Sequence, residues 1–183
     1  MTKLISLLSV IFFASSTLYS QNQISGTKEE CLKLEQLIKE KIDSVRIKKN
    51  RKALTSDEVL YNAALHHSEY IKKSGKLSHT ETGKKEFKTP QDRADHYGAV
   101  NLLVGENILW TDYNVNLTSD RGKKFSGKTI ESLANAIVTI WLESPEHYKN
   151  LLLKEYTLTG LAVVFDTTVN RVYVTQVFAY YSE

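Results

Sequence analysis

The chain has 183 residues, which is enough for one domain with a sizeable core and too few for two full domains. Its hydrophobic fraction of 42% and charged fraction of 25% are those of an ordinary folded protein, and its two prolines and eight glycines exclude a fibrous or disordered chain. The formal net charge of +3 is only mildly basic and does not by itself indicate nucleic acid as a partner.

Residues 1–20, "MTKLISLLSVIFFASSTLYS", have the layout of a secretory signal peptide. A lysine near the start is followed by the largely apolar stretch "LISLLSVIFF" and then by small and hydroxylated residues. This stretch is too short to span a bilayer, and no other segment is long and apolar enough to do so. We expect cleavage near Ser20 and a secreted or periplasmic protein, with an uncleaved membrane anchor as the alternative. Residues 21–27 are then a short linker, and residues 28–183 form one domain.

Two amphipathic helices are predicted next. Residues 27–47 begin with Thr27 and Glu30 at the spacing of a capping box and carry one apolar stripe. Thr55 and Glu58 are expected to begin a second helix in the same way, and glycine 75 is a typical stop signal for it. The inner face of the second helix has residues at helical spacing: Leu60, Ala63, Ala64, His67 and Ile71.

The middle of the chain is less regular. Residues 76–103 are polar and loop-like with short helical segments, whereas "GENILW" at 105–110 is typical of a short buried strand. A third helix follows from residue 130. The segment "SPEHYKNLLL" then restarts a helix, with Ser144 as its cap and Pro145 at its first position.

Residues 122–129 read "GKKFSGKT", a literal match to the phosphate-binding P-loop pattern. That pattern functions only with a buried strand before it, a helix after it and a parallel sheet around it. Here the preceding stretch is polar, and the two strands predicted at 157–165 and 171–181 are joined by a short loop, which indicates an antiparallel pair. We therefore expect no nucleotide cofactor.

Basic residues and cysteine suggest no specialised site. Five of the seven residues from Arg46 to Lys52 are basic. The run is either a patch for anionic polymers or a solvated helix end; we favour the helix end because no aromatic residues interleave with the charges. No nucleic-acid partner is therefore expected. Cys31 is the single cysteine, so neither an intramolecular disulfide nor a cysteine-based metal site can form, and its apolar helical face predicts a buried thiol.

The stretch from Leu60 to Phe178 resembles the CAP family, which comprises cysteine-rich secretory proteins, antigen 5 and pathogenesis-related 1 proteins. The resemblance rests on pieces in the family's order: "LYNAALHHSEYI", "LSHTETG", "DRADHYG", "GENI", "WLESPEHYKNLL", "TLTGLAVVF" and "VYVTQVFA". It is greatest to the bacterial branch that lacks disulfides. It implies an α+β fold, a three-layer α–β–α sandwich around a mostly antiparallel sheet.

The resemblance also implies a central cleft with two histidines and two acids. His79, Glu106 and His147 match three of these positions. Two imidazoles and a carboxylate are ligands that a divalent cation such as zinc prefers, so a metal site of His79, His147 and Glu106 is one expectation. Family members also bind sterols, fatty acids or other apolar molecules, so an unidentified small or apolar ligand is the other.

The fourth cleft position departs from the family pattern. Relatives place a glutamate three residues after the tryptophan, but that position, counted from Trp141, is Ser144. Glu143 and Glu146 flank it, and either could substitute. Glu146 also stands where bacterial relatives usually have glycine. We therefore assign His79, Glu106, His147, Ser144 and Glu146 to the cleft.

Two other functions stay open from the sequence. The same groups could act as acid and base in a cleft hydrolase, with Ser78 and Ser144 close to the histidines in sequence, although no G-x-S-x-G or H-E-x-x-H motif occurs. Alternatively, the histidines and Glu106 could form a hydrogen-bonded network in a structural or interaction module of the cell envelope.

Several further polar residues have predicted structural roles. We expect His67 to be a satisfied core residue, and His66 and His96 to be exposed. Arg93 is expected to form an ion pair or to bind carbonyl groups, and Asn107 to hold backbone near the cleft. The sequence does not indicate the oligomeric state.

Overall fold

A four-stranded sheet forms the middle layer of the structure, a computed structural model that describes residues 23–182. The strand order is β1-β5-β6-β2, and only the pairing of β1 with β5 is parallel. The strands are β1 (Thr55–Ser56), β2 (Leu102–Asp112), β5 (Leu158–Asp166) and β6 (Arg171–Tyr181). The predicted signal peptide, residues 1–20, lies outside the described residues, as do the first two residues of the predicted linker.

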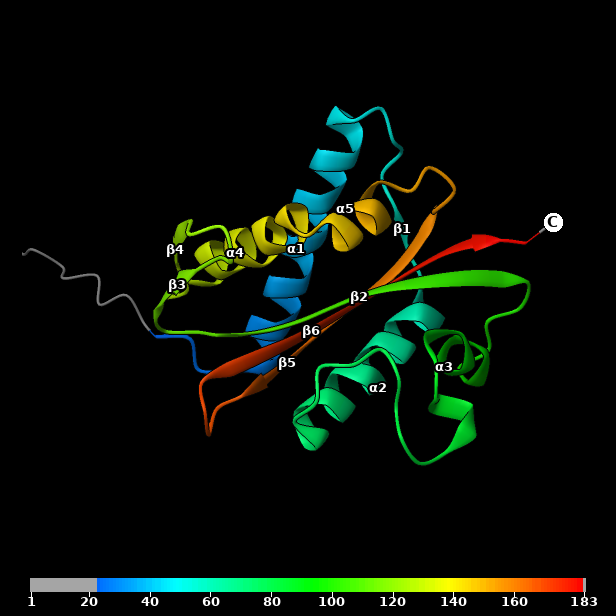
Figure 1. The fold of residues 1–183 in the computed structure, drawn as a ribbon, viewed down its shortest axis with the longest axis horizontal. Helices are drawn as coiled ribbons and strands as arrows, with labels where there is room; N and C mark the ends of the chain where they lie inside the picture. Colours follow the sequence, from blue (N-terminus) through cyan, green and yellow to red (C-terminus); the bar gives the residue numbers. More distant parts are fainter. Residues whose placement is uncertain (1–22, 183) are drawn as a thin grey trace, which may run out of the picture.

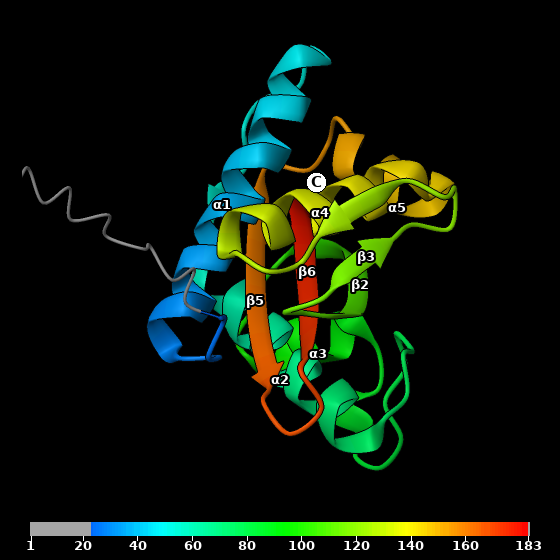
Figure 2. The ribbon, with the colours of Figure 1, turned by 90° about the vertical axis from the view of Figure 1, so that its left-hand side faces the viewer.

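Helices cover both faces of the sheet (Figures 1 and 2). One face packs against α1 (Lys28–Lys48), α4 (Ile130–Glu143) and α5 (Pro145–Leu152). The other face packs against α2 (Glu58–Ser74) and α3 (Pro90–His96), which follows the short 3-10 helix η1 (Lys85–Phe87). The three-layer sandwich with a mostly antiparallel sheet is thus confirmed.

Alternation along the strands creates the two cores. Leu161 and Val163 on β5 point toward α1 and α4, whereas Ala162 between them points toward α2. Successive strand residues face opposite sides, so each central strand contributes to both cores. The two central strands are accordingly almost continuous runs of buried residues.

The predicted start of the second helix is wrong, because its N-cap lies two residues later than expected. Asp57, not Thr55, is the N-cap: its carboxylate accepts a hydrogen bond from the Leu60 backbone N–H. Thr55 lies in β1, where its N–H donates to the Thr157 carbonyl. Tertiary pairing with β5 therefore replaces the local capping box. Thr27 and Glu30 do form the capping box predicted for α1.

The segment that matches the P-loop pattern has a different geometry. It begins in the turn between β3 (Asn116–Thr118) and β4 (Lys124–Ser126), which form a separate antiparallel hairpin. Helix α4 begins after the hairpin, with Thr129 as its N-cap. A short exposed hairpin strand stands where a P-loop requires a buried parallel strand.

Candidate functional site

The tripeptide of Gly105, Glu106 and Asn107 on edge strand β2 organises the site. Gly105 leaves room for the Tyr156 ring, whose hydroxyl occupies the place that a Cβ atom would take. Glu106 and Asn107 point to opposite faces of the sheet, as consecutive strand residues must. Glu106 faces α2 and α3, and Asn107 donates from Nδ2 to the His147 carbonyl of α5 at 3.1 Å. The site therefore wraps around the free edge of β2.

Glu106 is held by Arg93 and His79 on the α2–α3 side. Its side chain is 1% exposed, and Oε2 accepts from Arg93 Nη2 at 2.7 Å while Oε1 lies 2.8 Å from His79 Nδ1. Burial would raise the pKa of Glu106, but the His79 hydrogen bond and the charges of His67 and Arg93 outweigh it and lower that pKa. Glu106 is therefore an ionised carboxylate with both oxygens engaged.

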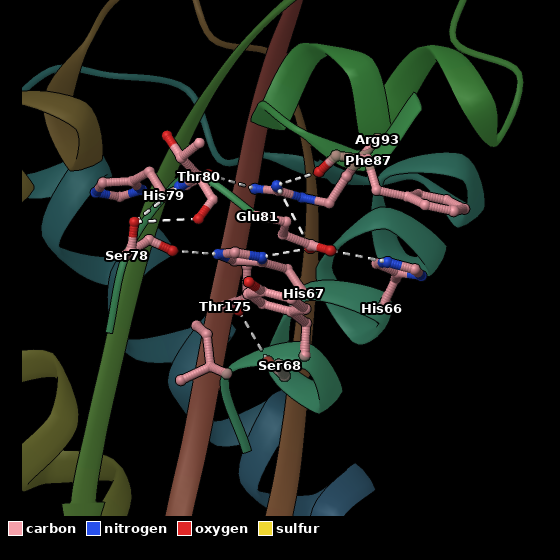
Figure 3. Close-up of polar contacts among 12 residues, drawn as sticks. His66, His67, Ser68, Ser78, His79, Thr80, Glu81, Phe87, Arg93 and Thr175 are labelled. Atoms are coloured by element: carbon pink, nitrogen blue, oxygen red, sulfur yellow. Dashed lines mark hydrogen bonds and ion pairs between the residues drawn. The ribbon is translucent and has the colours of Figure 1, made fainter. Parts of the chain in front are cut away.

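A second buried carboxylate, Glu81, continues this network (Figure 3). Its oxygens lie 2.8 Å from His67 Nδ1, 3.2 Å from His66 Nε2 and 3.5 Å from Arg93 Nη1. His67 Nε2 also lies 2.9 Å from the Ser78 carbonyl, so both of its ring nitrogens face acceptors. The His67 ring is therefore held at both of its nitrogens.

His147 reaches the edge of β2 from the opposite layer. It is half-buried on α5, and its Nδ1 atom is buried without a hydrogen-bond partner. Burial and the nearby charge of His79 lower the pKa of His147, and the carboxylate of Glu146 only partly opposes this. Its imidazole is therefore neutral at pH 7 and free to bind.

A cleft of about 460 Å³ lies beside His147 at the β2 edge. Its walls come from the loop after α2, strand β2, the β3–β4 turn, α4 and α5, and they consist of Leu77, Ile108, Leu109, Ser119, Asp120, Arg121, Ile140, Glu143, Ser144, Pro145 and His147. Like Nδ1 of His147, Oε2 of Glu143 is buried and has no hydrogen-bond partner among the described residues. Buried polar atoms in folded proteins are nearly always hydrogen-bonded, so these two atoms, on side chains that line the cleft, are exceptions to the usual pattern.

Comparison with known proteins identifies the family. The model of the family "CAP: Cysteine-rich secretory protein family" matches residues 39–178. The chain belongs to this family. A search of curated proteins found no match.

Solved structures show the same CAP fold. An extracellular protein with an SCP domain from Bacillus anthracis has a TM-score of 0.61 and 24% identity over 82% of this chain and 41% of its own. An outer surface protein from Borrelia burgdorferi has a TM-score of 0.64 and 21% identity over 88% and 98%. A cysteine-rich secretory protein from Staphylococcus aureus has a TM-score of 0.53 and 15% identity over 84% and 40%. The chain thus spans about two fifths of the first and third of these proteins.

The residues assigned to the CAP cleft separate into two groups. His79 and Glu106 are in direct contact on the α2–α3 side, whereas His147 and Ser144 line the cleft on the α5 side. Glu146 is exposed and is not among the lining residues; Glu143, the other flanking acid, is. The glutamate next to the fourth position that faces the cleft is therefore Glu143.

Two parts of the site were not predicted from the sequence: Glu81, which joins the polar network, and the β3–β4 turn, which lines the cleft. Glu81 is 5% exposed and contacts two histidines and Arg93. As one acid in a polar loop, it has no periodic pattern that would predict burial. His67 is fully buried and hydrogen-bonded as expected, and His96 is exposed. The prediction for His66 is wrong: it is half-buried, stacks on Phe87 at 4.1 Å and contacts Glu81.

Arg93 and Asn107 fit their predicted roles, whereas Cys31, predicted to be buried, is only half-buried. The Arg93 guanidinium is fully buried and donates to the Phe87 and His79 carbonyls as well as to Glu106. Asn107 binds the His147 carbonyl, which positions α5 against β2. Cys31 packs partly buried against the core, and burial and nearby Glu35 raise the pKa of its thiol.

The donor set does not fit a three-ligand metal site. Within residues 23–182, no group of three or more His, Cys, Asp or Glu side chains is arranged to hold a metal ion. Both oxygens of Glu106 are engaged, one by Arg93 and one by His79. The two imidazoles remain as candidate ligands. Glu106 then orients the His79 ring, as carboxylates do for metal-bound histidines.

Neither candidate serine has a histidine base. The Ser78 hydroxyl donates to the Thr80 carbonyl and accepts from the Thr80 N–H. Ser144 lines the cleft together with His147, but over the described part of the chain no serine hydroxyl is hydrogen-bonded to a histidine ring. The arrangement of an activated nucleophile is therefore not formed.

No helix within residues 23–182 has the length and apolar character needed to cross a bilayer.

Proposed function

We propose that this chain is an exported binding protein of the CAP family that takes a small amphipathic ligand in the cleft beside His147. The observation that carries the proposal is the pair of buried, unpartnered atoms, Glu143 Oε2 and His147 Nδ1, on side chains that line one cleft of about 460 Å³. Ligand sites are typically concave and largely apolar, with a few polar groups that fix orientation.

The cleft has both kinds of surface. Leu77, Ile108 and Ile140 supply apolar walls, and Glu143 and His147 supply acceptor and donor positions. A ligand with a hydrogen-bond donor for Glu143 and an apolar body would satisfy the buried groups and shield the apolar walls from water.

Export rests on residues 1–20, which have the sequence pattern of a signal peptide. Two proteins of similar fold carry the descriptions "extracellular protein" and "outer surface protein", which agrees with this location. Release of the chain without residues 1–20 into the periplasm or medium is the expected outcome, and N-terminal sequencing of the mature protein checks it.

A binding screen on a cleft-narrowing variant tests the proposed function. Thermal-shift and saturation-transfer measurements would use amino acids, short peptides, apolar amines and apolar carboxylates. Leu77 lines the cleft and is 44% exposed, so Leu77→Trp should narrow the cleft without disturbing the core. Val169→Trp, at the exposed β5–β6 loop, is the matched control. Compounds that bind the wild-type chain should bind Val169→Trp equally and Leu77→Trp at least tenfold more weakly. Equal binding by both variants would exclude this cleft.

A second pair of variants separates the cleft from the P-loop-like segment. His147→Ala removes a ring that lines the cleft, so ligand binding should weaken, whereas Lys128→Ala should leave it unchanged because Lys128 is exposed outside the cleft. Loss of binding in Lys128→Ala alone would instead point to the hairpin.

Divalent-metal binding is the second candidate, and one observation favours it. Glu106 contacts Nδ1 of His79, which leaves Nε2 of the half-exposed ring available to a metal beside His147. Titration with Zn²⁺ should then give binding that both His79→Ala and His147→Ala abolish. Unchanged binding in both variants would rule out this pair of ligands.

The other two hypotheses have less support. A cleft hydrolase needs an activated nucleophile, and Ser78 is instead bonded to Thr80. A purely structural role explains the network of Glu106 and Arg93, which ties β2 to α3. It does not explain the two unpartnered atoms at the cleft.

A further inference from the structure

The turn between β3 and β4 forms one wall of the cleft and brings a cation to it. Hydrogen bonds between Ser119 and Gly122 and between Ser119 and Lys123, each 2.8 Å long, close this turn, and Ser119 is 7% exposed. Asp120 and Arg121 occupy the two central positions of the turn and line the cleft. The hydrogen-bonded turn therefore places Arg121 in the wall of the cleft that also includes Ile140 and Glu143 of α4.

Charges of both signs line the cleft without neutralising each other. Arg121 comes from the turn and Glu143 from the end of α4. Among the ion pairs formed by residues 23–182, none includes Asp120, Arg121 or Glu143. Two acidic residues and one arginine therefore line a cleft whose other residues are largely apolar.

We propose that the cleft selects a small zwitterion with an apolar body, such as an amino acid or a short peptide with free ends. The ligand places its carboxylate at Arg121 and its ammonium group at Glu143. This inference rests on the proposed function and names the class of ligand.

The lining charges disfavour the simpler ligands. A molecule with only a carboxylate would pair with Arg121 but would meet Asp120 and Glu143 without compensation. An apolar amine would satisfy Glu143 and leave Arg121 unpaired. A zwitterion pairs with both Arg121 and Glu143 and leaves only Asp120, which is exposed to water at the turn. The planar guanidinium can bind a carboxylate through two parallel hydrogen bonds. The apolar residues Ile108, Leu109 and Ile140 then contact the ligand's side chains.

Calorimetry with capped peptides tests the assignment of each end. Leucylalanine with free ends, its N-acetyl form and its C-terminal amide would be titrated into the full domain. Free leucine and leucyl-leucyl-alanine would distinguish an amino-acid site from a peptide site. Each cap removes one charge, so each should weaken binding about tenfold or more relative to the free dipeptide.

Variants assign each preference to one residue. Arg121→Gln should remove the preference for the free carboxylate over the amide but keep the preference for the free amino group. Glu143→Gln should do the reverse. Lys123→Gln is the matched control, since Lys123 lies on the same hairpin with its ammonium over the Phe125 ring, 5.3 Å from the centroid, and outside the cleft. Arg121 is exposed, so its replacement should leave the melting temperature unchanged.

Equal binding of free and capped dipeptides, or preferences that persist in Arg121→Gln and Glu143→Gln, would overturn the proposal. If no zwitterion binds while another amphipathic compound binds and is blocked by Leu77→Trp, the ligand class is wrong and the proposed function stands. If no compound is sensitive to Leu77→Trp, both are wrong.

Discussion

At the scale of single residues, Glu106 and Arg93 form a buried ion pair around which the polar network is built. Arg93 is fully buried, and Glu106 and Glu81 are its only carboxylate partners within residues 23–182. Removing one member of a buried pair leaves the other charge uncompensated, which costs far more than breaking a surface pair.

Replacing the buried carboxylate should therefore destabilise the protein strongly. Glu106→Gln is expected to lower the free energy of unfolding by about 3 kcal/mol or more, measured by urea denaturation. The control is Asp112→Asn on the same strand, which breaks a half-exposed pair with Arg171 at 2.9 Å and should cost at most about 1 kcal/mol. Similar losses in both variants would contradict the buried role of Glu106.

His147 should make the free energy of unfolding depend on pH in a higher pH range than Glu106 does. Its pKa in the folded protein is lowered from 6.5, so below that pH the unfolded chain binds a proton more readily and stability falls. Glu106, whose pKa is lowered from 4.5, contributes stability above that value and loses it as pH falls further. Melting temperatures from pH 8 to 4 should show that His147→Gln removes the decline below 6.5 and keeps the decline below 4.5. An unchanged profile would contradict the assignment.

Single-residue predictions from the sequence were most accurate where a residue type has one dominant role. His67 was predicted as a satisfied core residue from its place on the inner face of a helix. Arg93 was predicted to form an ion pair or to bind carbonyl groups, and it does both. The position of Glu81 could not be predicted, because its burial depends on a loop returning over α2.

At the scale of elements, side chains cover the open edges of the sheet, which are β2 and the part of β5 beyond the two-residue strand β1. On β2, Gln91 binds the Leu102 carbonyl and the Val104 N–H, and Asn150 binds the Glu106 carbonyl. On β5, Glu35 of α1 accepts from the Val163 N–H at 2.9 Å. Such caps satisfy groups that would otherwise be open to pairing with another chain.

The cap on β5 should be sensitive to pH. Burial raises the pKa of Glu35 to about 7, although the Val163 hydrogen bond opposes this. The protonated form is therefore favoured on folding, and its stabilisation is lost as pH rises from 4.5 through 7. Glu35→Gln keeps the acceptor and removes the charge, so at pH 8 it should raise the free energy of unfolding by on the order of 1 kcal/mol.

Glu40→Gln on the exposed side of the same helix is the control and should change stability little. Urea denaturation at pH 5 and pH 8 distinguishes the two variants. A gain that is equal at both pH values, or a loss at pH 8, would contradict the buried position of the Glu35 carboxyl group.

Element boundaries show where local sequence signals suffice. The capping box at Thr27 and the stop at Gly75 were confirmed because both act through their own helix. The start of α2 was predicted wrongly because Thr55 lies in β1 and pairs with β5. That strand lies about a hundred residues later in the chain, so no local signal indicates the pairing. Strand β2 likewise extends beyond "GENILW" at both ends, because β6 pairs with it throughout.

At the scale of the whole molecule, the cleft forms where two layers meet around the edge of the sheet. Its walls come from five segments between Leu77 and His147, which no local spacing motif connects. The family resemblance predicted the fold, and the three residues that it matched, His79, Glu106 and His147, lie near this edge. It could not predict the β3–β4 turn as a wall, because that depends on how the hairpin folds against α4.

Histidine-selective NMR of the domain titrated with leucylalanine tests the central claim, a ligand site at this edge, most directly. His147 lines the cleft, whereas His96 lies exposed on α3 and provides an internal reference. We predict that the His147 ring signals shift saturably while those of His96 stay in place. Saturable binding that leaves the His147 signals unmoved, or that moves both rings equally, would contradict the account.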